Sequence, residues 1–418
     1  MIKPTALIIT IGDEIIIGQI TDTNSQWLAY HLYKDGFEIR KMISIKDNAT
    51  EIIETLDSVI NVFDLIVITG GLGPTNDDIT KKSLASYFNT KLVQNGDVLN
   101  DVKEMVMRRL GSIDLNKRNH DQSLVPENCI VLRNSVGTAP GMLFKESKHR
   151  AITISLPGVP HEMKWLYENR LVPFFSKEFE LKPQSYDLFS IMGHSESGLA
   201  HLLESWENNL PQEWKPAYLP SAGIIKLRLF RPTEQNYKYD KYVSQLKEIL
   251  GKSIVAVNEE SIQITISKIL KSNQLTICTA ESCTGGNIAK SITEIPGASS
   301  YFRGSIIAYS NDIKTSLLNV DNDTLSIKGA VSQETAEQMA KGAAEALNCN
   351  ISIATTGIAG PNGGTETKPV GTIWIAISIN GIITSKQYTF GTLRSVNIER
   401  STNAAMLLLL STLQCIYE

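Results

Sequence analysis

The first 170 residues alternate apolar runs with amphipathic segments, and this alternation restricts the possible fold more than any other feature. Strands are predicted at residues 6–11, 38–45 and 64–69, and helices at residues 24–34, 48–61 and 81–88. Continuous apolar runs are typical of parallel strands that are covered on both faces. We therefore predict an α/β fold with a parallel sheet. Ligands of such sheets bind beyond the carboxyl ends of the strands, where Asp13, Asp47 and Gly70 fall.

Composition excludes several classes of protein. The 418 residues carry 40 Lys and Arg against 44 Asp and Glu, a net charge of −4, so no general attraction to nucleic acid or anionic membrane is expected. The 5 cysteines are scattered without a CxxC pair, which argues against a zinc ribbon or a disulfide scaffold. The apolar runs at 6–11 and 404–410 are too short for a signal peptide or a membrane span. We expect a cytoplasmic protein.

Length and composition predict a chain of several domains. We place an α/β domain at residues 1–170, a small α+β domain at 171–257 and a second α/β domain at 258–418. The middle region is rich in tyrosine and contains Trp206 and Trp214. Its strands are predicted at 185–193 and 223–230.

The segment from Thr69 to Thr80, TGGLGPTNDDIT, is the first with evident chemistry. Glycines between a strand and a helix let backbone N–H groups approach a phosphate. Asp77 and Asp78 beside them would repel that phosphate unless a divalent cation lies between. Acidic residues also cap helix starts without any further role, and spacing alone supports both interpretations equally. Glu14 and Asp47 at neighbouring strand ends favour the metal-assisted site.

These residues resemble the N-terminal domain of the CinA family, which has the MoaB/MogA-like fold. The shared motifs are Gly12-Asp13-Glu14, Asp22-Thr23-Asn24-Ser25, the glycine segment, Gly137-Thr138-Ala139-Pro140-Gly141 and LPGVP with Glu162-Met163. The resemblance implies a metal-dependent ADP-ribose pyrophosphatase that uses Mg, Co or Mn. It implies metal ligands Asp78, Asp77 and Glu14, and substrate contacts from Gly70, Gly71, Gly73, Asp47 and Asn24.

The middle region is similar to the KH-like linker of the same family through its segment 193–198, GHSESG. It has no clear GxxG, the loop with which KH domains clamp a nucleic-acid backbone. A spacer or dimer element is the favoured interpretation. His194 and His201 have no neighbouring ligand residues in the sequence that would suggest a metal site.

The segment from Thr279 to Gly286, TAESCTGG, places Ser282 between a strand and a helix start. This arrangement exposes a hydroxyl and aims helix-start N–H groups at a developing oxyanion. No histidine follows His201, so a lysine is the candidate base, and Lys314 and Tyr309 follow another strand end. On spacing alone, a plain helix cap at Ser282 is somewhat favoured. Cys283 is the rival nucleophile, although an isolated cysteine is more often a buried apolar residue.

This region looks like the CinA C-terminal domain, whose stand-alone form deamidates nicotinamide mononucleotide without a cofactor. The resemblance implies Ser282 as nucleophile assisted by Tyr309 and Lys314. It also implies substrate contacts from Thr284, Gly285, Gly286, Thr356, Gly357, Gly360 and Arg394. The family's Gly-Asp-Arg is replaced here by Thr392-Leu393-Arg394, so the local contacts must differ.

We therefore expect a homodimeric, bifunctional hydrolase of nicotinamide mononucleotide and ADP-ribose that binds neither membrane nor nucleic acid. Two other classes stay open. One is a pterin-nucleotide-binding module without catalysis. The other is a competence scaffold that binds single strands through its middle domain.

Overall fold

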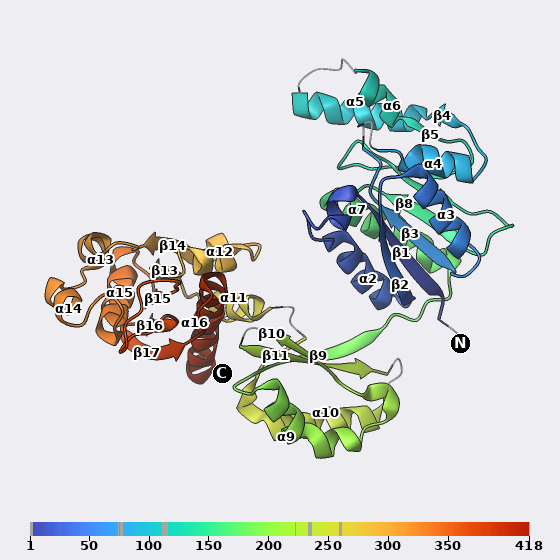
Figure 1. The fold of residues 1–418 in the computed structure, drawn as a ribbon. Coiled ribbons are helices and arrows are strands. Elements are labelled where there is room, and N and C mark those ends of the chain that lie inside the picture. The colour runs from blue at the N-terminus through green and yellow to red at the C-terminus, as the bar shows by residue number, and fades with distance from the viewer. Residues whose placement is uncertain are drawn as a thin grey trace. The chain divides into compact units, whose positions relative to one another are not determined.

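A computed structural model describes residues 3–73, 75, 78–110, 116–221, 223–232, 236–258 and 261–417. The chain folds into two compact units, Met1–Ser185 and Tyr186–Glu418 (Figure 1). Both are mixtures of helix and sheet, which confirms the predicted α/β class. The bounds of the three predicted domains stay predictions. Within the described residues, no helix is long and apolar enough to cross a membrane.

The first unit is built on a six-stranded sheet of order β2-β1-β3-β8-β7-β6. Its strands are β2 (Glu38–Ile45), β1 (Thr5–Ile11), β3 (Leu65–Thr69), β8 (Ile152–Leu156), β7 (Gly141–Phe144) and β6 (Ile130–Leu132). The pairs β1–β2, β1–β3 and β3–β8 are parallel, whereas β7 is antiparallel to both of its neighbours. The carboxyl ends of four strands therefore meet at one edge, as the alternating pattern predicts.

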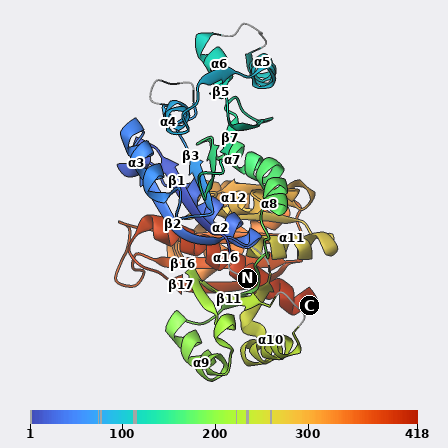
Figure 2. The ribbon, with the colours of Figure 1, turned by 90° about the vertical axis from the view of Figure 1, so that its right-hand side faces the viewer.

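Helices cover both faces of this sheet (Figures 1 and 2). Alternate residues of β1 enter opposite cores: Leu7 and Ile9 face one, and Ala6 and Ile8 face the other. The first core contains apolar side chains of α3 (Ala49–Val59) and α4 (Thr80–Tyr87), and the second those of α2 (Thr23–Asp35), α7 (Pro160–Leu166) and α8 (Val172–Glu178). The remaining elements are α1 (Asp13–Ile16), β4 (Leu92–Gln94), α5 (Gly96–Leu110), α6 (Lys117–Gln122) and β5 (Leu124–Pro126). Burial on both faces explains why β1 is apolar except at Thr5 and Thr10.

The second unit begins with a four-stranded sheet of order β10-β11-β9-β12. These strands are β10 (Ala217–Ser221), β11 (Ile224–Arg231), β9 (Ser185–Met192) and β12 (Ile254–Val257). The helices α9 (Glu196–Asn208) and α10 (Tyr237–Leu250) pack on it through a core that includes Trp206 and Trp214. The likeness of this part to a KH domain stays a prediction.

A five-stranded sheet of order β14-β13-β15-β16-β17 completes the second unit. Its strands are β14 (Phe302–Ile307), β13 (Ile277–Glu281), β15 (Ile351–Gly357), β16 (Thr372–Ile379) and β17 (Ile382–Thr389), of which the first three run parallel. One core joins the sheet to α11 (Ile262–Ser272), α12 (Asn287–Thr293) and α16 (Arg394–Tyr417). The other joins it to α13 (Asn311–Leu318), α14 (Asn322–Ile327) and α15 (Gln333–Ala346).

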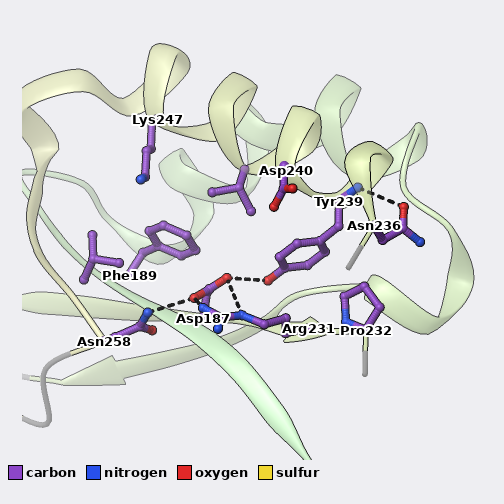
Figure 3. A pocket seen from close by; sticks show the side chains of 11 residues that line it. Asp187, Phe189, Arg231, Pro232, Asn236, Tyr239, Asp240, Lys247 and Asn258 are labelled. Carbon is purple, nitrogen blue, oxygen red and sulfur yellow. Dashed lines mark hydrogen bonds and ion pairs between the residues drawn. The ribbon is translucent and has the colours of Figure 1, made fainter. Parts of the chain in front are cut away.

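A buried carboxylate organises the four-stranded part (Figure 3). Asp187 of β9 accepts hydrogen bonds from Tyr239 Oη at 2.7 Å and Asn258 Nδ2 at 2.8 Å, and it pairs with the guanidinium of Arg231. These partners come from α10, the residue after β12, and β11. The polar groups beside the cavity are therefore already hydrogen-bonded to one another. This network holds the strands and α10 together and does not offer free groups to a ligand.

The contribution of Asp187 to the stability of the fold depends on pH. Burial alone would raise the pKa of Asp187, but the hydrogen bonds from Arg231, Asn258 and Tyr239 outweigh it and lower that pKa. Because the folded-state pKa lies below the unfolded value of about 3.9, the carboxylate stabilises the fold at neutral pH. This contribution is lost as the pH falls below that value and through the folded-state pKa.

We predict that Asp187→Asn lowers the free energy of unfolding by about 2 kcal/mol at pH 7, because it removes the charged acceptor of several buried donors. Urea unfolding between pH 7 and pH 2.5 measures this, and the difference from wild type should shrink at the acid end. Asp240→Asn is the matched control, since Asp240 lines the same cavity but is exposed. A constant difference across the pH range would contradict the assignment.

Candidate active sites

Ser282 lies where β13 ends, at the carboxyl edge of the parallel strands. Its backbone N–H donates to the carbonyl of Thr355 in the neighbouring strand β15, at 3.0 Å. The residue is buried, and its hydroxyl faces Lys314 rather than bulk solvent. The strand-to-helix turn that the sequence predicts here is therefore present and positions the candidate nucleophile.

Lys314 is the base candidate that the fold brings to this hydroxyl. Its side chain is only 1% exposed, and its Nζ lies 3.1 Å from Ser282 Oγ and 2.7 Å from the carbonyl oxygen of Ala308. Burial lowers the pKa of Lys314, because the ammonium form loses its water while these partners are neutral oxygens. The residue lies within α13, one turn beyond the strand end where the sequence pattern places it.

The helix-start amides differ from the prediction. The fully buried carboxylate of Glu281 accepts hydrogen bonds from the N–H groups of Gly286, Ile288 and Ala289, at 2.9, 3.1 and 2.8 Å. The N–H of Gly285 donates to the carbonyl of Ser282 at 3.2 Å. Gly285 and Gly286 are therefore not available as oxyanion donors.

Two other amides of the same turn are available. Within the described part of the chain, the backbone N–H groups of Cys283 and Thr284 donate to no backbone carbonyl. They directly follow Ser282 and precede the amides that Glu281 occupies. The sequence analysis did not assign a role to Glu281, because this residue ends β13 and lies five positions before the first of the amides that it accepts from.

The rival nucleophile is poorly suited to the role. Cys283 belongs to the apolar core beside α12 and α16, and burial raises the pKa of its thiol to about 12. A thiol with that pKa is almost entirely protonated at neutral pH, and the thiolate is the reactive form. The geometry therefore favours Ser282.

Residues far apart in the sequence meet beside this pair. Arg394, at the start of α16, donates from Nη2 to Tyr309 Oη at 2.9 Å and from Nη1 to the carbonyl of Gly360 at 3.0 Å. A hydroxyl and a carbonyl therefore position the Arg394 guanidinium. The aspartate that precedes this arginine in the family motif is replaced here by Leu393. The Tyr309 carbonyl also accepts a hydrogen bond from Lys314, at 3.4 Å.

The glycine-rich loop after β15 is tightly held. Thr356 and Gly357 end the strand, and the Thr356 hydroxyl donates to the carbonyl of Ala330 at 2.6 Å. Gly360 has a left-handed φ of 91°, and a Cβ atom there would lie 2.6 Å from Val370 Cγ1. The hydroxyl of Thr356 is thus already used in a hydrogen bond within the protein. The conformation of the loop requires glycine at position 360.

The first unit has a cavity of about 380 Å³ at the carboxyl edge of its sheet. It is lined by every predicted site residue of this unit that the structure describes, namely Glu14, Asn24, Asp47, Gly70, Gly71, Gly73 and Asp78. The predicted metal ligand Asp77 lies outside the described residues. A cavity of this size suits a small-molecule ligand.

The glycine loop of this cavity cannot carry side chains at two positions. A Cβ atom at Gly70 would lie 2.1 Å from the carbonyl oxygen of Ile11, and one at Gly71 would lie 2.0 Å from Thr80 Oγ1. Both glycines have a left-handed φ, of 115° and 64°. Asp78 closes the loop by accepting hydrogen bonds from the N–H groups of Gly73 at 2.7 Å and Thr75 at 2.9 Å.

Asn24 joins three parts of the cavity wall. Its Nδ2 donates to the carbonyl of Gly158 at 2.8 Å and to Thr69 Oγ1 at 3.2 Å, and that hydroxyl donates to the carbonyl of Pro157 at 3.1 Å. This chain of bonds orients the amide, because its nitrogen must face the Gly158 carbonyl.

Glu162 is a further cavity residue to which the sequence analysis gave no role. Its buried carboxylate accepts a hydrogen bond from Asn134 Nδ2 at 2.7 Å. A Cβ atom at Gly137 would collide with it, at 1.9 Å from its Cδ. The only signal for it in the sequence was its place in the shared motif after LPGVP.

The acidic residues of the cavity do not form a complete metal site by themselves. Among the described residues, no group of three His, Cys, Asp or Glu side chains is placed to hold a metal ion. Glu14, Asp47 and Asp78 nevertheless line one cavity, and oxygen donors of this kind suit Mg²⁺ or Mn²⁺.

Family models match both units. Residues 7–177 match the probable molybdopterin binding domain, and residues 259–413 match the CinA C-terminal domain. Among solved structures, the competence/damage inducible protein CihA from Agrobacterium tumefaciens is 37% identical, covers 37% of this chain and 93% of its own, and has a TM-score of 0.35. The protein CinA from Thermoplasma acidophilum is 31% identical, with coverages of 42% and 98% and a TM-score of 0.37.

Relatives match over nearly the whole length. A CinA-like protein of Flavobacterium psychrophilum is 42% identical over 406 residues, 96% of both chains. A putative competence-damage inducible protein of Halothermothrix orenii is 37% identical over 405 residues, also 96% of both chains. The chain therefore belongs to the CinA family.

Proposed function

We propose that the chain is a bifunctional hydrolase of pyridine-nucleotide metabolism. Its C-terminal part deamidates nicotinamide mononucleotide to nicotinate mononucleotide and ammonia, and its first unit hydrolyses ADP-ribose to AMP and ribose 5-phosphate. The observation that carries the proposal is the distance of 3.1 Å between Lys314 Nζ and Ser282 Oγ in a buried setting. A serine beside a buried lysine is an activated nucleophile with its own base.

The reaction follows from this geometry. Neutral Lys314 accepts the proton of Ser282 as Oγ attacks the carboxamide carbon. The oxyanion that forms is stabilised by the amides of Cys283 and Thr284. The Lys314 ammonium returns the proton to the departing nitrogen, which leaves as ammonia. Water then attacks the carbonyl carbon of the ester on Ser282 and gives a proton to Lys314. As the bond between that carbon and Ser282 Oγ breaks, the Lys314 ammonium returns this proton to Oγ. The acid product leaves and loses its own proton to the solvent as the carboxylate.

Arg394 supplies the recognition of the substrate phosphate in this proposal. Its guanidinium is exposed, lies beside Tyr309, and is held at the glycine loop through the Gly360 carbonyl. Arginine suits this role because its planar donor set matches phosphate oxygens. Tyr309 then contributes to substrate binding, since its hydroxyl bonds Arg394.

The cavity of the first unit supports pyrophosphate hydrolysis. The N–H groups of Gly70 and Gly73 already donate to the Leu156 carbonyl and to Asp78, so Gly71 and Leu72 are the loop residues whose amides would bind a phosphate. Mg²⁺ commonly binds through one or two carboxylates together with substrate phosphates, so Glu14, Asp78 and the predicted ligand Asp77 would hold it. When bound, the metal neutralises phosphoryl charge and lowers the pKa of a bound water.

A second candidate for this unit is pterin-nucleotide binding without catalysis. The match of residues 7–177 to a probable molybdopterin binding domain favours it. Binding of molybdopterin by a purified chain that leaves ADP-ribose intact in the presence of Mg²⁺, Co²⁺ or Mn²⁺ would support this alternative.

Ser282→Ala and Lys314→Arg should each lower the kcat of deamidation by at least about 10³-fold. The arginine retains a cationic hydrogen-bond donor but cannot be deprotonated to act as a base. Ammonia release from nicotinamide mononucleotide measures the effect. Cys283→Ala is the matched control and should cost less than about tenfold, because it keeps the backbone N–H. If Cys283→Ala is inactive while Ser282→Ala keeps full activity, the nucleophile is the Cys283 thiol and not the Ser282 hydroxyl.

The kcat of deamidation should rise with pH and then level off. The base must be unprotonated, and burial lowers the pKa of Lys314, so the rise is expected below the ordinary lysine pKa of about 10.4. A pH profile of wild-type kcat measures it. Activity that falls through the same range would exclude a neutral lysine base.

Asp78→Asn should abolish ADP-ribose cleavage and leave deamidation intact. The substitution removes a negative charge from the metal-assisted site and disturbs the loop that Asp78 closes on Gly73 and Thr75. Release of AMP from ADP-ribose with Mg²⁺ measures the first activity, and ammonia release the second. If Asp78→Asn folds normally but loses both activities, the proposal that the two reactions occur at independent sites is wrong.

A further inference from the structure

A further cavity of the second unit lies between its four-stranded sheet and α16, and it contains none of the residues proposed for deamidation. Its volume is about 750 Å³, a size that suits a small organic molecule. Leu407 and Leu408 of α16 form one wall, and Tyr388 of β17 and the nearby Phe390 form another. Met192, at the end of β9, contributes a further apolar side chain to the lining.

The two rings of the aromatic wall lie nearly parallel. Tyr388 and Phe390 have ring centroids 5.8 Å apart and ring planes that differ by 22°, and both side chains are partly buried. Leu407, which lines the same cavity, is 6% exposed and belongs to the core of this part of the chain. Aromatic rings bind other rings through stacked or edge contacts. The walls therefore suit an apolar ligand with a planar ring.

Two cationic side chains also line this cavity. Lys386 and Arg400 are both exposed, and Lys386 Nζ lies 5.3 Å from the centroid of the Tyr388 ring. Among the described residues of the lining, none is acidic, and neither cation forms an ion pair within the part of the chain that the structure describes. Both positive charges therefore lie beside an apolar cavity without a carboxylate to neutralise them.

We propose that this cavity binds an organic anion with a planar aromatic body, at a site separate from both candidate active sites. The aromatic body lies against Tyr388 and Phe390, and its anionic group faces Lys386 and Arg400. Removal of the apolar walls from water supplies most of the affinity. The two cations favour the anion over a neutral molecule of the same shape. The assignment is independent of the proposed deamidation, because no residue is shared with it.

The alternative occupant is a second copy of this chain. A copy would have to insert an apolar group together with an acidic side chain, whereas an aromatic anion combines both properties in one molecule. The charge complementarity of Lys386 and Arg400 with such an anion therefore favours the small ligand. The two occupants are separable by experiment, because only a copy changes the oligomeric state.

The test compares two probes that differ only in their charge. 8-Anilinonaphthalene-1-sulfonate is an aromatic anion, and N-phenyl-1-naphthylamine has the same rings without the sulfonate. Fluorescence titration of the full chain gives the Kd of each. Lys386→Gln and Arg400→Gln should each weaken binding of the sulfonate about fivefold and leave binding of the neutral amine unchanged. Lys341→Gln is the matched control, since Lys341 is an exposed lysine of α15 outside the cavity.

Two further measurements test the walls. Val396→Asp places an acid in the lining near the first turn of α16, where a helix tolerates it, and should weaken the sulfonate more than the amine. Competition against the bound sulfonate tests the aromatic preference, and 1-naphthoate should displace it at lower concentration than decanoate. Circular dichroism of each variant verifies that the fold is kept.

Several results would overturn the assignment. They are equal affinity of wild type for both probes, unchanged sulfonate binding in both glutamine variants, an equal loss in Lys341→Gln, or stronger displacement by decanoate. If wild type binds neither probe and sediments as a dimer that Val396→Asp dissociates, the cavity is a contact between copies and not a ligand site.

Discussion

The contact between Lys314 and Ser282 depends on the burial of the lysine, which lowers the pKa of its amine although the charge of Asp312 acts in the opposite direction. The Nζ atom has Ser282 Oγ, the Ala308 carbonyl and the Tyr309 carbonyl as partners, all neutral oxygens. A carboxylate in their place would raise the pKa of the lysine and remove the base. Burial therefore favours the uncharged amine, which is the form that the proposed amide hydrolysis requires.

The packing of α13 makes this contact possible. Lys314 lies on that helix, and the helix ends against α15 at a point where Gly342 faces the carbonyl of Leu318. A Cβ atom at Gly342 would lie 1.9 Å from that oxygen, so any other residue would push the two helices apart. A change in this spacing moves the amine relative to the hydroxyl, which is held independently by β13. Gly342 therefore allows the close packing of α13 against α15, the helix that carries no part of the Ser282–Lys314 pair.

Glu281 has a complementary role on the other side of the nucleophile. Its carboxylate satisfies three amides at the start of α12, where a negative charge is favoured by the helix dipole. With them occupied, the free donors nearest Ser282 in the described turn are the amides of Cys283 and Thr284.

The features that could be predicted from the sequence are those that neighbouring residues determine. The alternation of β1 between two cores and the strand-to-helix turn at Ser282 follow from neighbouring residues. The pairing of Arg394 with Tyr309 across 85 positions does not, because it depends on how α16 packs against the sheet. The engaged amides of Gly285 and Gly286 were missed for a different reason. A glycine pair at a helix start suggests free N–H groups, and only the fold shows that the Glu281 side chain turns back onto them.

The two candidate sites occupy the same position in their sheets but differ in their charge. Both lie at the carboxyl edge of parallel strands, where polar loops meet. The cavity of the first unit gathers Glu14, Asp47 and Asp78, an arrangement that is useful only with a cation or with hydrogen-bond donors to balance it. The site around Ser282 instead buries its amine among neutral oxygens. One sheet edge therefore suits charged phosphoryl chemistry, and the other suits attack on a neutral amide, for which an uncharged base is needed.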